Sequence, residues 1–278
     1  MNRLDRRALF TSGAAAALLA ATGTSVHGAP KSGGTLRLAL PRDGGMMADL
    51  ARWASHDALV EIGPDGVLRG ELAAAWRSDA TARQWWFDLR RDAQFLSGRD
   101  VSVSDVVASL KRGLDGVAAV EAEGAARIAI TLCIANPHFP YLLASADFAI
   151  TEGGVDLAAL DQRTGSGCYQ ITRANADRDF RAERRRDHYK DAQSGWFDAV
   201  EVTVIPDPKI RAEALRDGFV DVAAFPAAQM LRDRRDLTFH PSVEDMQLVA
   251  HHGVGVPRVI GRAAALDDAR LLERWWMV

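Results

Sequence analysis

The sequence has few cysteines, no excess of basic residues and almost no long apolar run, and each absence excludes a class of protein. Two cysteines in 278 residues exclude a small disulfide-rich fold and a zinc signature of paired cysteines. The formal net charge is −3, and lysine and arginine are spread along the chain, which argues against a nucleic-acid-binding face. Beyond residue 29 no segment reaches about 18 uninterrupted apolar residues, so no membrane-spanning helix is expected.

The remaining composition is that of an ordinary globular protein. Hydrophobic residues make up 48% of the chain and charged residues 26%, enough for one large or two modest domains. The basic run at residues 184–186 is flanked by Glu183 and Asp187. We therefore interpret it as a solvated strand end.

The first 29 residues have the layout of a secretory signal peptide. Arginines precede an apolar, alanine-rich run at residues 9–21, and small residues follow up to residue 29. The pair Arg6-Arg7 resembles a twin-arginine export signal. Cleavage is expected after Gly28 or Ala29, and no cysteine lies near that point to carry a lipid. These features predict a soluble, exported and most simply periplasmic protein.

The two cysteines, Cys133 and Cys168, would then lie in an oxidising compartment. A disulfide is allowed there, but sequence separation does not show whether the two are close in space. A disulfide and two isolated thiols therefore both remain open.

Strands alternate with helices along the chain, which predicts an α/β (mixed α+β) fold. A helix capped by Ser102 or Ser104 is expected to bury Val106, Val107 and Leu110. Another helix is expected at residues 208–216, because Pro208 suits the start of a helix and Gly218 follows its end. The expected strands lie at 35–40, 86–89, 126–134, 147–150, 199–205 and 221–223, and the expected helices at 50–59, 141–146 and 208–216.

A glycine-rich turn leads into a strand in the middle of the chain, and a strand, a proline-bounded turn and a helix follow. The residues are Gly165-Ser166-Gly167-Cys168-Tyr169, Val204-Ile205-Pro206-Asp207-Pro208 and Asp217-Gly218-Phe219-Val220-Asp221-Val222-Ala223. In this order the segments resemble the extracytoplasmic solute-binding proteins of family 5, the peptide/nickel type that serves ABC importers. Cys168 stands where that family usually has proline.

A second, denser segment resembles the same family between residues 71 and 112. Aromatic, glycine and acidic positions follow one another in the family's order. The matching residues are Glu71-Leu72-Ala73 with Trp76, Trp86-Phe87-Asp88-Leu89-Arg90, Phe95 with Gly98, and Ser104-Asp105-Val106-Val107 with Ser109-Leu110-Lys111-Arg112.

The resemblance implies a periplasmic binding protein-like (type II) first lobe with an inserted smaller domain. The expected bounds are a signal peptide at 1–29, a first lobe at 30–48 and 164–250, an inserted domain at 49–163, and a tail with a short helix at 251–278. Domains rarely hold below about 50 residues. The second lobe of the family is therefore expected to be missing or vestigial.

The function implied is that of a periplasmic binding protein that delivers peptides or similar small organic solutes to an inner-membrane ABC permease. Capture by closure buries the ligand between two surfaces. With one lobe missing, an exported interaction or accessory module without a transport role is the alternative, as is a homodimer that supplies the second wall. The tryptophans at 85, 86, 275 and 276 are candidates for a partner face or for the core.

Metal binding is a second alternative, because relatives of this type bind nickel complexes. His251-His252 and His240 invite it, but adjacent histidines on a strand point to opposite faces, so no metal or cofactor is expected. An enzyme is not expected either, because Ser166 lies outside a Gly-x-Ser-x-Gly elbow. In the family the loop after the first strand contacts ligand. Here it holds Met46 and Met47, which fit the core equally well, so ligand-binding residues are not assigned.

Overall fold

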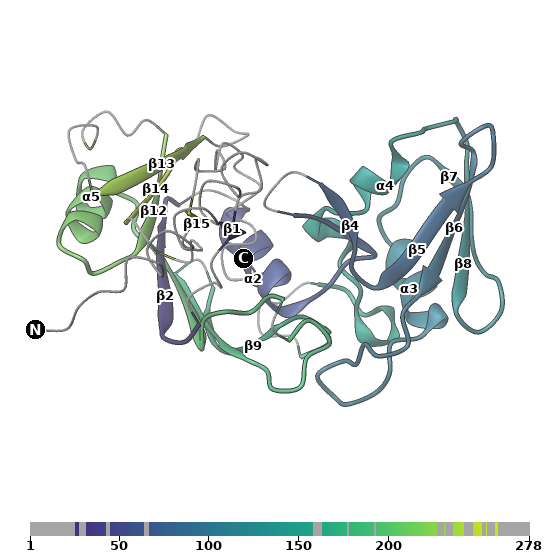
Figure 1. Cartoon of the computed structure of the whole chain (residues 1–278), viewed down its shortest axis with the longest axis horizontal. Coiled ribbons are helices and arrows are strands. Elements are labelled where there is room, and N and C mark those ends of the chain that lie inside the picture. The colour runs from purple at the N-terminus through teal and green to yellow at the C-terminus, as the bar shows by residue number, and fades with distance from the viewer. Residues whose placement is uncertain are drawn as a thin grey trace, which may run out of the picture.

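The computed structural model describes residues 26–27, 32–42, 45–63, 67–157, 163–176, 178–191, 193–226, 231, 236–241, 247–251, 254 and 259–260. In this part of the chain two sheets, each with its own core, lie side by side (Figure 1). The expectations for the signal peptide with Arg6 and Arg7, and for the helix of the C-terminal tail, lie outside the described residues.

The larger sheet has seven strands in the order β13-β14-β12-β2-β11-β10-β9. Strand β2 is central and pairs in parallel with both β11 and β12, whereas the remaining pairs are antiparallel. The strands are β2 (Thr35–Leu40), β9 (Tyr169–Asn175), β10 (Asp179–Arg184), β11 (Ala199–Val204), β12 (Val222–Phe225), β13 (Leu237–Pro241) and β14 (Gln247–His251).

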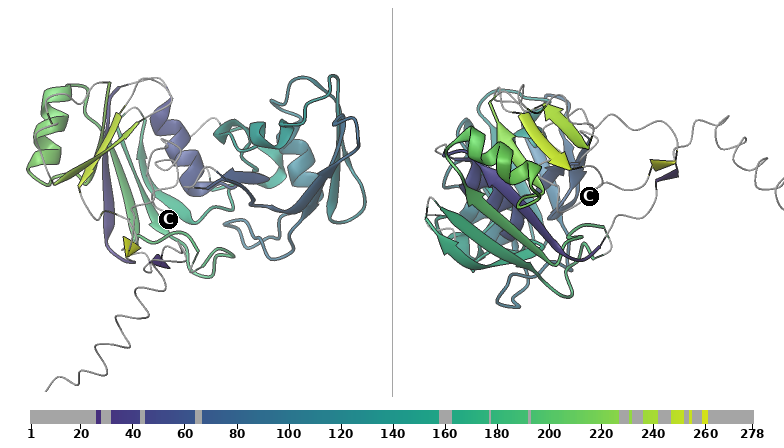
Figure 2. Two further views of the ribbon diagram at one scale, coloured as in Figure 1. Left: turned by 45° about the horizontal axis from the view of Figure 1, so that its top comes forward. Right: turned by 90° about the vertical axis from the view of Figure 1, so that its left-hand side faces the viewer.

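Two helices cover opposite faces of this sheet. Helix α2 (Met46–Ser55) packs on one face and helix α5 (Pro208–Arg216) on the other (Figure 2). Side chains alternate across a strand, and in β2 Leu36 and Leu38 join the core under α2 while Ala39 joins the core under α5. The central strands are thus buried on both sides, as parallel strands usually are.

The smaller sheet is antiparallel, with four strands in the order β5-β6-β8-β7. Strand β6 alternates buried and half-buried side chains as expected, and Phe87 from it packs with Phe95 and Phe139 in a core beneath α3. The elements are β5 (Ala73–Ser78), β6 (Gln84–Leu89), α3 (Val103–Leu110), β7 (Val117–Ala122), β8 (Arg127–Leu132), α4 (Phe139–Leu142), and the 3-10 turns η1 (Ala146–Phe148) and η2 (Glu152–Gly154).

Two short pairs complete the described strands. Strands β3 (Val60–Ile62) and β4 (Leu68–Gly70) form an antiparallel hairpin between the two sheets, and β1 (Val26–His27) pairs with β15 (Val259–Ile260). Among the described residues no helix has the length and apolar character needed to cross a bilayer.

Helix α3 begins as the sequence predicts. Ser102 is its N-cap, and Ser102 and Asp105 form a reciprocal capping box, which satisfies two backbone donors that the first turn leaves free. Of the expected apolar stripe, Val106 and Leu110 are fully buried, and Val107 packs against the core from its edge.

Two expected elements are wrong in type or position. The strand expected at 147–150 is instead the 3-10 turn η1, because the Ser145 side chain accepts a hydrogen bond from the backbone of Asp147. The helix expected at 50–59 lies four residues earlier, as α2. Leu50, Ala51 and Ala54 of α2 pack in the core of the seven-stranded sheet. This packing favours a domain boundary after the helix, rather than at the expected residue 49.

Candidate functional site

The carboxyl ends of three parallel strands meet at one edge of the seven-stranded sheet. The backbone N–H of Ile205 donates to the carbonyl of Leu40 at 2.8 Å, which keeps the ends of β2 and β11 together. Each of β2, β11 and β12 is followed within two residues by a proline, at Pro41, Pro206 and Pro226. Proline has no N–H to continue a ladder, so the three strands stop at this edge, which we call the carboxyl edge.

The chain leaves the carboxyl edge in two directions. After β2 it runs to α2 on one face, and after β11 it runs to α5 on the other face (Figure 2). In open α/β sheets such a reversal leaves a crevice between the two loops, where ligands bind. The helix after β11 is capped by Asp207, whose side chain accepts from the backbone of Lys209 at 2.8 Å. The carboxyl edge is therefore the candidate ligand surface.

The two methionines near this edge take different positions. Met47 is buried in the core of the seven-stranded sheet, whereas Met46, at the first turn of α2, is half-buried and packs against that core from outside. Met47 is thus a core residue, and Met46 is the one that lies at the candidate ligand surface.

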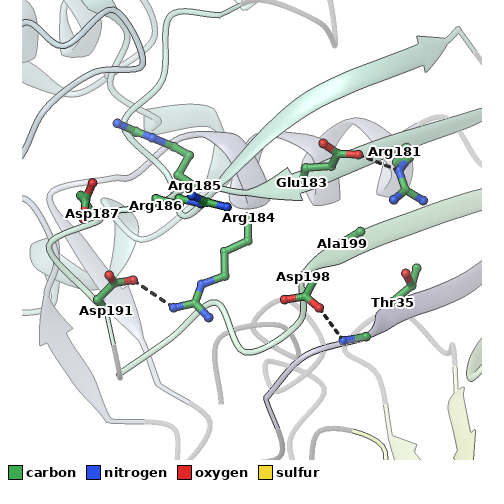
Figure 3. Close-up of a pocket in the computed structure, with 11 residues that line it drawn as sticks. Thr35, Arg181, Glu183, Arg184, Arg185, Arg186, Asp187, Asp191, Asp198 and Ala199 are labelled. Atoms are coloured by element: carbon green, nitrogen blue, oxygen red, sulfur yellow. Dashed lines mark hydrogen bonds and ion pairs between the residues drawn. The ribbon is translucent and has the colours of Figure 1, made fainter.

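A pocket of about 740 Å³ lies at the opposite, amino edge of the same strands (Figure 3). It lies beside the starts of β2 and β11 and the end of β10. The lining residues are Gly34, Thr35, Arg181, Glu183, Arg184, Arg185, Arg186, Asp187, Asp191, Asp198 and Ala199.

The charges of this pocket largely neutralise one another. Arg184 pairs with Asp191 at 3.0 Å, Arg181 pairs with Glu183 at 3.1 Å, and Asp198 accepts from the backbone of Gly34 at 2.9 Å (Figure 3). A pocket for an anion would present unopposed donors. The pocket is lined by positive and negative side chains that pair with one another, and it lies at the edge of the sheet opposite the candidate ligand surface. We therefore do not assign it as the solute site.

A cluster of buried charges joins the two cores. Lys190 follows β10 in the seven-stranded unit, and its Nζ contacts Glu61 Oε2 at 2.7 Å and Glu71 Oε1 at 2.5 Å. His188 lies two residues earlier, with Nε2 at 3.7 Å from Asp57 Oδ2. All of these side chains are buried except Glu61, which is half-buried. We call these five residues the ionic joint.

The electrostatics of the ionic joint favour the charged forms of His188 and Asp57. Burial alone would lower the pKa of His188, but Asp57 and the Cys168 sulfur, 3.4 Å from Nδ1, raise that pKa to about 10. Burial alone would raise the pKa of Asp57, but His188 and Lys190 hold it well below its ordinary value. For nearby His56 burial outweighs the opposing attraction of Asp57 and lowers its pKa to about 4.

The basic run at 184–186 is only partly the solvated strand end that the sequence predicts. Arg185 turns inward, and its guanidinium donates to the backbone carbonyls of Phe95 at 3.2 Å and Gly167 at 3.3 Å. It thereby links the loop after β6 to the turn before β9. Sequence reasoning missed this link and the ionic joint. The sequence carried one sign of these buried charges, namely acidic and basic residues placed beside apolar or aromatic residues, as in Glu71-Leu72.

The cysteines and histidines form no site in the described part of the chain. Cys133 is exposed after β8, Cys168 is buried in the other core, and both are free thiols, which decides the open disulfide question. His251 bonds the carbonyl of Leu215 at 2.6 Å, whereas His252 and the side chain of His240 lie outside the described residues. No group of three His, Cys, Asp or Glu among the described residues is placed to hold a metal.

Of the tryptophans considered for a partner face, Trp85 is buried in the four-stranded core and Trp86 is half-buried under the Arg77 guanidinium. Trp275 and Trp276 lie outside the described residues.

Solved structures with the same fold are periplasmic binding proteins. The PBP AgaA from A. tumefaciens R10, in complex with agropinic acid, is 23% identical with a TM-score of 0.66, over 74% of this chain and 47% of that one. DppA from Helicobacter pylori, in complex with the peptide STSA, is 20% identical with a TM-score of 0.64, over 75% and 50%. NikZ from Campylobacter jejuni, in complex with Ni(L-His), is 16% identical with a TM-score of 0.60, over 74% and 46%.

The fold and the carboxyl-edge surface thus define one lobe of a type II periplasmic binding protein, with a smaller unit inserted in it. A family model described as bacterial extracellular solute-binding proteins, family 5 Middle, matches residues 67–243, and the chain belongs to that family. It spans about half the length of the solved structures that it matches. No curated protein matches the chain.

Proposed function

We propose that this chain is a periplasmic solute-binding protein that presents peptides or similar small solutes to an ABC importer. The observation that carries the proposal is the carboxyl edge of β2, β11 and β12, where the chain diverges to opposite faces of a family 5 fold. Family membership supports a role outside the cytoplasm, and so does the export signal that the sequence predicts at residues 1–29.

The affinity expected of this surface is modest. A ligand buried between two surfaces gains contacts on both sides, whereas the carboxyl edge described here offers one. Ordering a flexible peptide also costs free energy on binding. We therefore expect this surface alone to bind a solute more weakly than a site that encloses it, and to bind more tightly where a second copy supplies the opposite wall.

The test is ligand-induced stabilisation of the chain expressed with its export signal and purified from the periplasmic fraction. Three probes represent three chemical classes, namely the tetrapeptide Ser-Thr-Ser-Ala, agropinic acid, and nickel with L-histidine. A probe at ten times its dissociation constant stabilises the folded state by about 1.4 kcal/mol, which raises the melting temperature of a protein of this size by roughly 3–6 °C. We expect the peptide to do so.

A pair of variants locates the binding surface. Met46→Lys places a charge at the candidate ligand surface and should remove the peptide-induced shift. Phe219→Lys changes a residue that is 71% exposed beyond the far end of α5 and should leave the shift intact. Light scattering during the titration reports whether a dimer forms. A strict monomer that none of the three probes stabilises would rule out the transport role and leave the accessory module.

A further inference from the structure

A buried arginine lies directly beneath the carboxyl edge. Arg211 is on the first turn of α5, and only 1% of its surface is exposed. Burying a guanidinium is costly unless its donors are satisfied. The hydrogen-bond partners of the Arg211 guanidinium therefore show which parts of the fold this buried charge connects.

The partners of Arg211 are backbone carbonyls from two different segments. Its Nε donates to the carbonyl of Ala224 in β12 at 2.9 Å. Its Nη1 donates to the carbonyls of Ile205 at 2.5 Å and Pro206 at 2.9 Å, in the loop between β11 and α5. The planar, rigid fork of the guanidinium sets the directions of these donors, so it fixes the loop relative to the strand.

The sheet itself does not provide that connection. Strand β12 pairs with β2 only at Val222 and Ala223, so Ala224 lies one residue beyond the last sheet pair on that side. Strand β11 pairs with β2 along its whole length, to Val204. Strands β11 and β12 do not pair with each other, because β2 lies between them. Beyond the residues paired with β2, Arg211 donates hydrogen bonds to both the loop after β11 and the end of β12.

We infer that Arg211 is a positioning residue for the solute surface: its guanidinium sets the separation of the β11–α5 loop and the end of β12. The inference rests on the proposed function for its consequence, because those two segments form the carboxyl edge. A solute would contact the loop and the strand end, whereas Arg211, which is buried, acts through them. Phe225, whose ring centroid lies 5.5 Å from the guanidinium, holds the group in place from the side.

The variant Arg211→Lys tests this role. Lysine keeps a positive charge on a long side chain but presents one compact ammonium, which does not span both segments. We expect amide hydrogen exchange at the non-proline residues of 205–210 and 223–225 to become at least tenfold faster. Exchange in β7 and β8 of the smaller sheet should stay unchanged. The affinity for the tetrapeptide Ser-Thr-Ser-Ala should fall at least tenfold.

Leu215→Ala is the matched control on the same helix. Leu215 is fully buried in the core under α5, so its truncation loosens the packing of the helix without removing a donor to the three carbonyls. If Arg211→Lys and Leu215→Ala accelerate exchange in the same segments to the same extent, Arg211 is an ordinary core residue and the inference is overturned.

A measurement on the unaltered protein covers the case in which Arg211→Lys does not fold. In protein labelled with ¹⁵N-arginine, the Arg211 Nε–H should exchange slowly and show contacts to residues 205 and 224. Fast exchange or absent contacts would overturn the inference. These readouts need no ligand, so they separate failure of Arg211 as a positioning residue from failure of the solute-binding proposal, in which the unaltered protein binds no probe.

Discussion

At the scale of single residues, the ionic joint concentrates more buried charge than the rest of the described chain. Each cation has a carboxylate within 4 Å: Glu61 and Glu71 for Lys190, and Asp57 for His188. Desolvation makes such pairs costly to form, and losing one partner leaves an uncompensated charge. The joint therefore makes stability depend on every member being ionised.

The pKa of His188 sets the sign of one pH dependence. Because its pKa is raised to about 10 in the folded protein and is about 6.5 when unfolded, the folded state holds a proton that the unfolded state loses above pH 6.5. Its contribution is complete below pH 6.5 and disappears as the pH rises to 10, at up to about 1.4 kcal/mol per pH unit. Urea unfolding at pH 6 to 10 measures this slope.

His188→Gln is the variant that isolates this contribution. It should be less stable than the unaltered protein at pH 6, and the difference should shrink toward pH 10. Asp57 acts in the opposite window, because its lowered pKa contributes stability above its ordinary pKa that is lost in acid. A difference between His188→Gln and the unaltered protein that stays constant from pH 6 to 10 would show that His188 is neutral in the folded state.

At the scale of elements, the turn at Gly165–Tyr169 is shaped by its contact with the end of α2. The backbone N–H of Gly167 donates to the carbonyl of Ser55 at 3.0 Å. A Cβ at Gly167 would lie 2.5 Å from the Ser55 carbonyl carbon and 2.7 Å from the His56 nitrogen. Backbone atoms cannot move away as a flexible side chain can, so glycine is required by close approach.

Gly167→Ala should accordingly destabilise the protein. Overpacking typically costs about 1–3 kcal/mol, and a clash with backbone places this substitution at the upper end of that range. Gly113→Ala is the control, because nothing lies within 4 Å of a Cβ at that position. Chemical denaturation should show a large loss for Gly167→Ala and a change below about 0.5 kcal/mol for Gly113→Ala. Equal effects would contradict the close-approach argument.

Elements whose signals are local were predictable from the sequence. The Ser102 cap, the alternation in β6, and Pro208 and Gly218 around α5 each depend on neighbouring residues, and the structure confirms them. From the sequence only the end of β10 was expected, at the basic run, and β13 was not expected as a strand. Both form hairpins with a neighbouring strand, β10 with β9 and β13 with β14. The further pairing of β10 with β11 and of β14 with β12 places these hairpins in the sheet, and one sequence does not display that pairing.

One part of the candidate site could be predicted from the sequence, and other parts could not. The loop after the first strand could be placed from the family resemblance, and it lies at the carboxyl edge. The roles of Arg211 and of the ionic joint could not be predicted, because each joins residues distant in sequence. Lys190 and Glu71, for example, are separated by 119 positions, and only the fold brings them together.

At the scale of the whole molecule, the two cores are separate apolar clusters. Polar contacts connect them, together with Tyr189, which packs against the four-stranded core from the segment after β10. Besides the ionic joint, the backbone N–H of Leu96 donates to the carbonyl of Gly165 at 2.9 Å, and the N–H of Ile150 donates to the carbonyl of Asp57 at 2.9 Å. These contacts cross between the units shown side by side in Figure 1. They predict that the seven-stranded and four-stranded units unfold together.

Asp57→Asn tests whether the ionic joint provides this coupling. Asparagine keeps the shape of the side chain but removes the counter-charge of His188, so the interface between the units should weaken by about 3–5 kcal/mol, while each apolar core remains intact. The unaltered protein should show one calorimetric transition and the variant two. Hydrogen exchange should assign one transition to β5–β8 and the other to the seven-stranded sheet.

Asp92→Asn is the matched control, because the Asp92 side chain is 64% exposed and pairs with Arg90 on the surface. Exposed pairs contribute about 0–1 kcal/mol, so this variant should unfold in one transition. If Asp57→Asn also unfolds in one transition, with the two units losing exchange protection together, the coupling comes from the backbone contacts. If the unaltered protein already shows two transitions, the units are energetically independent despite the buried charges between them.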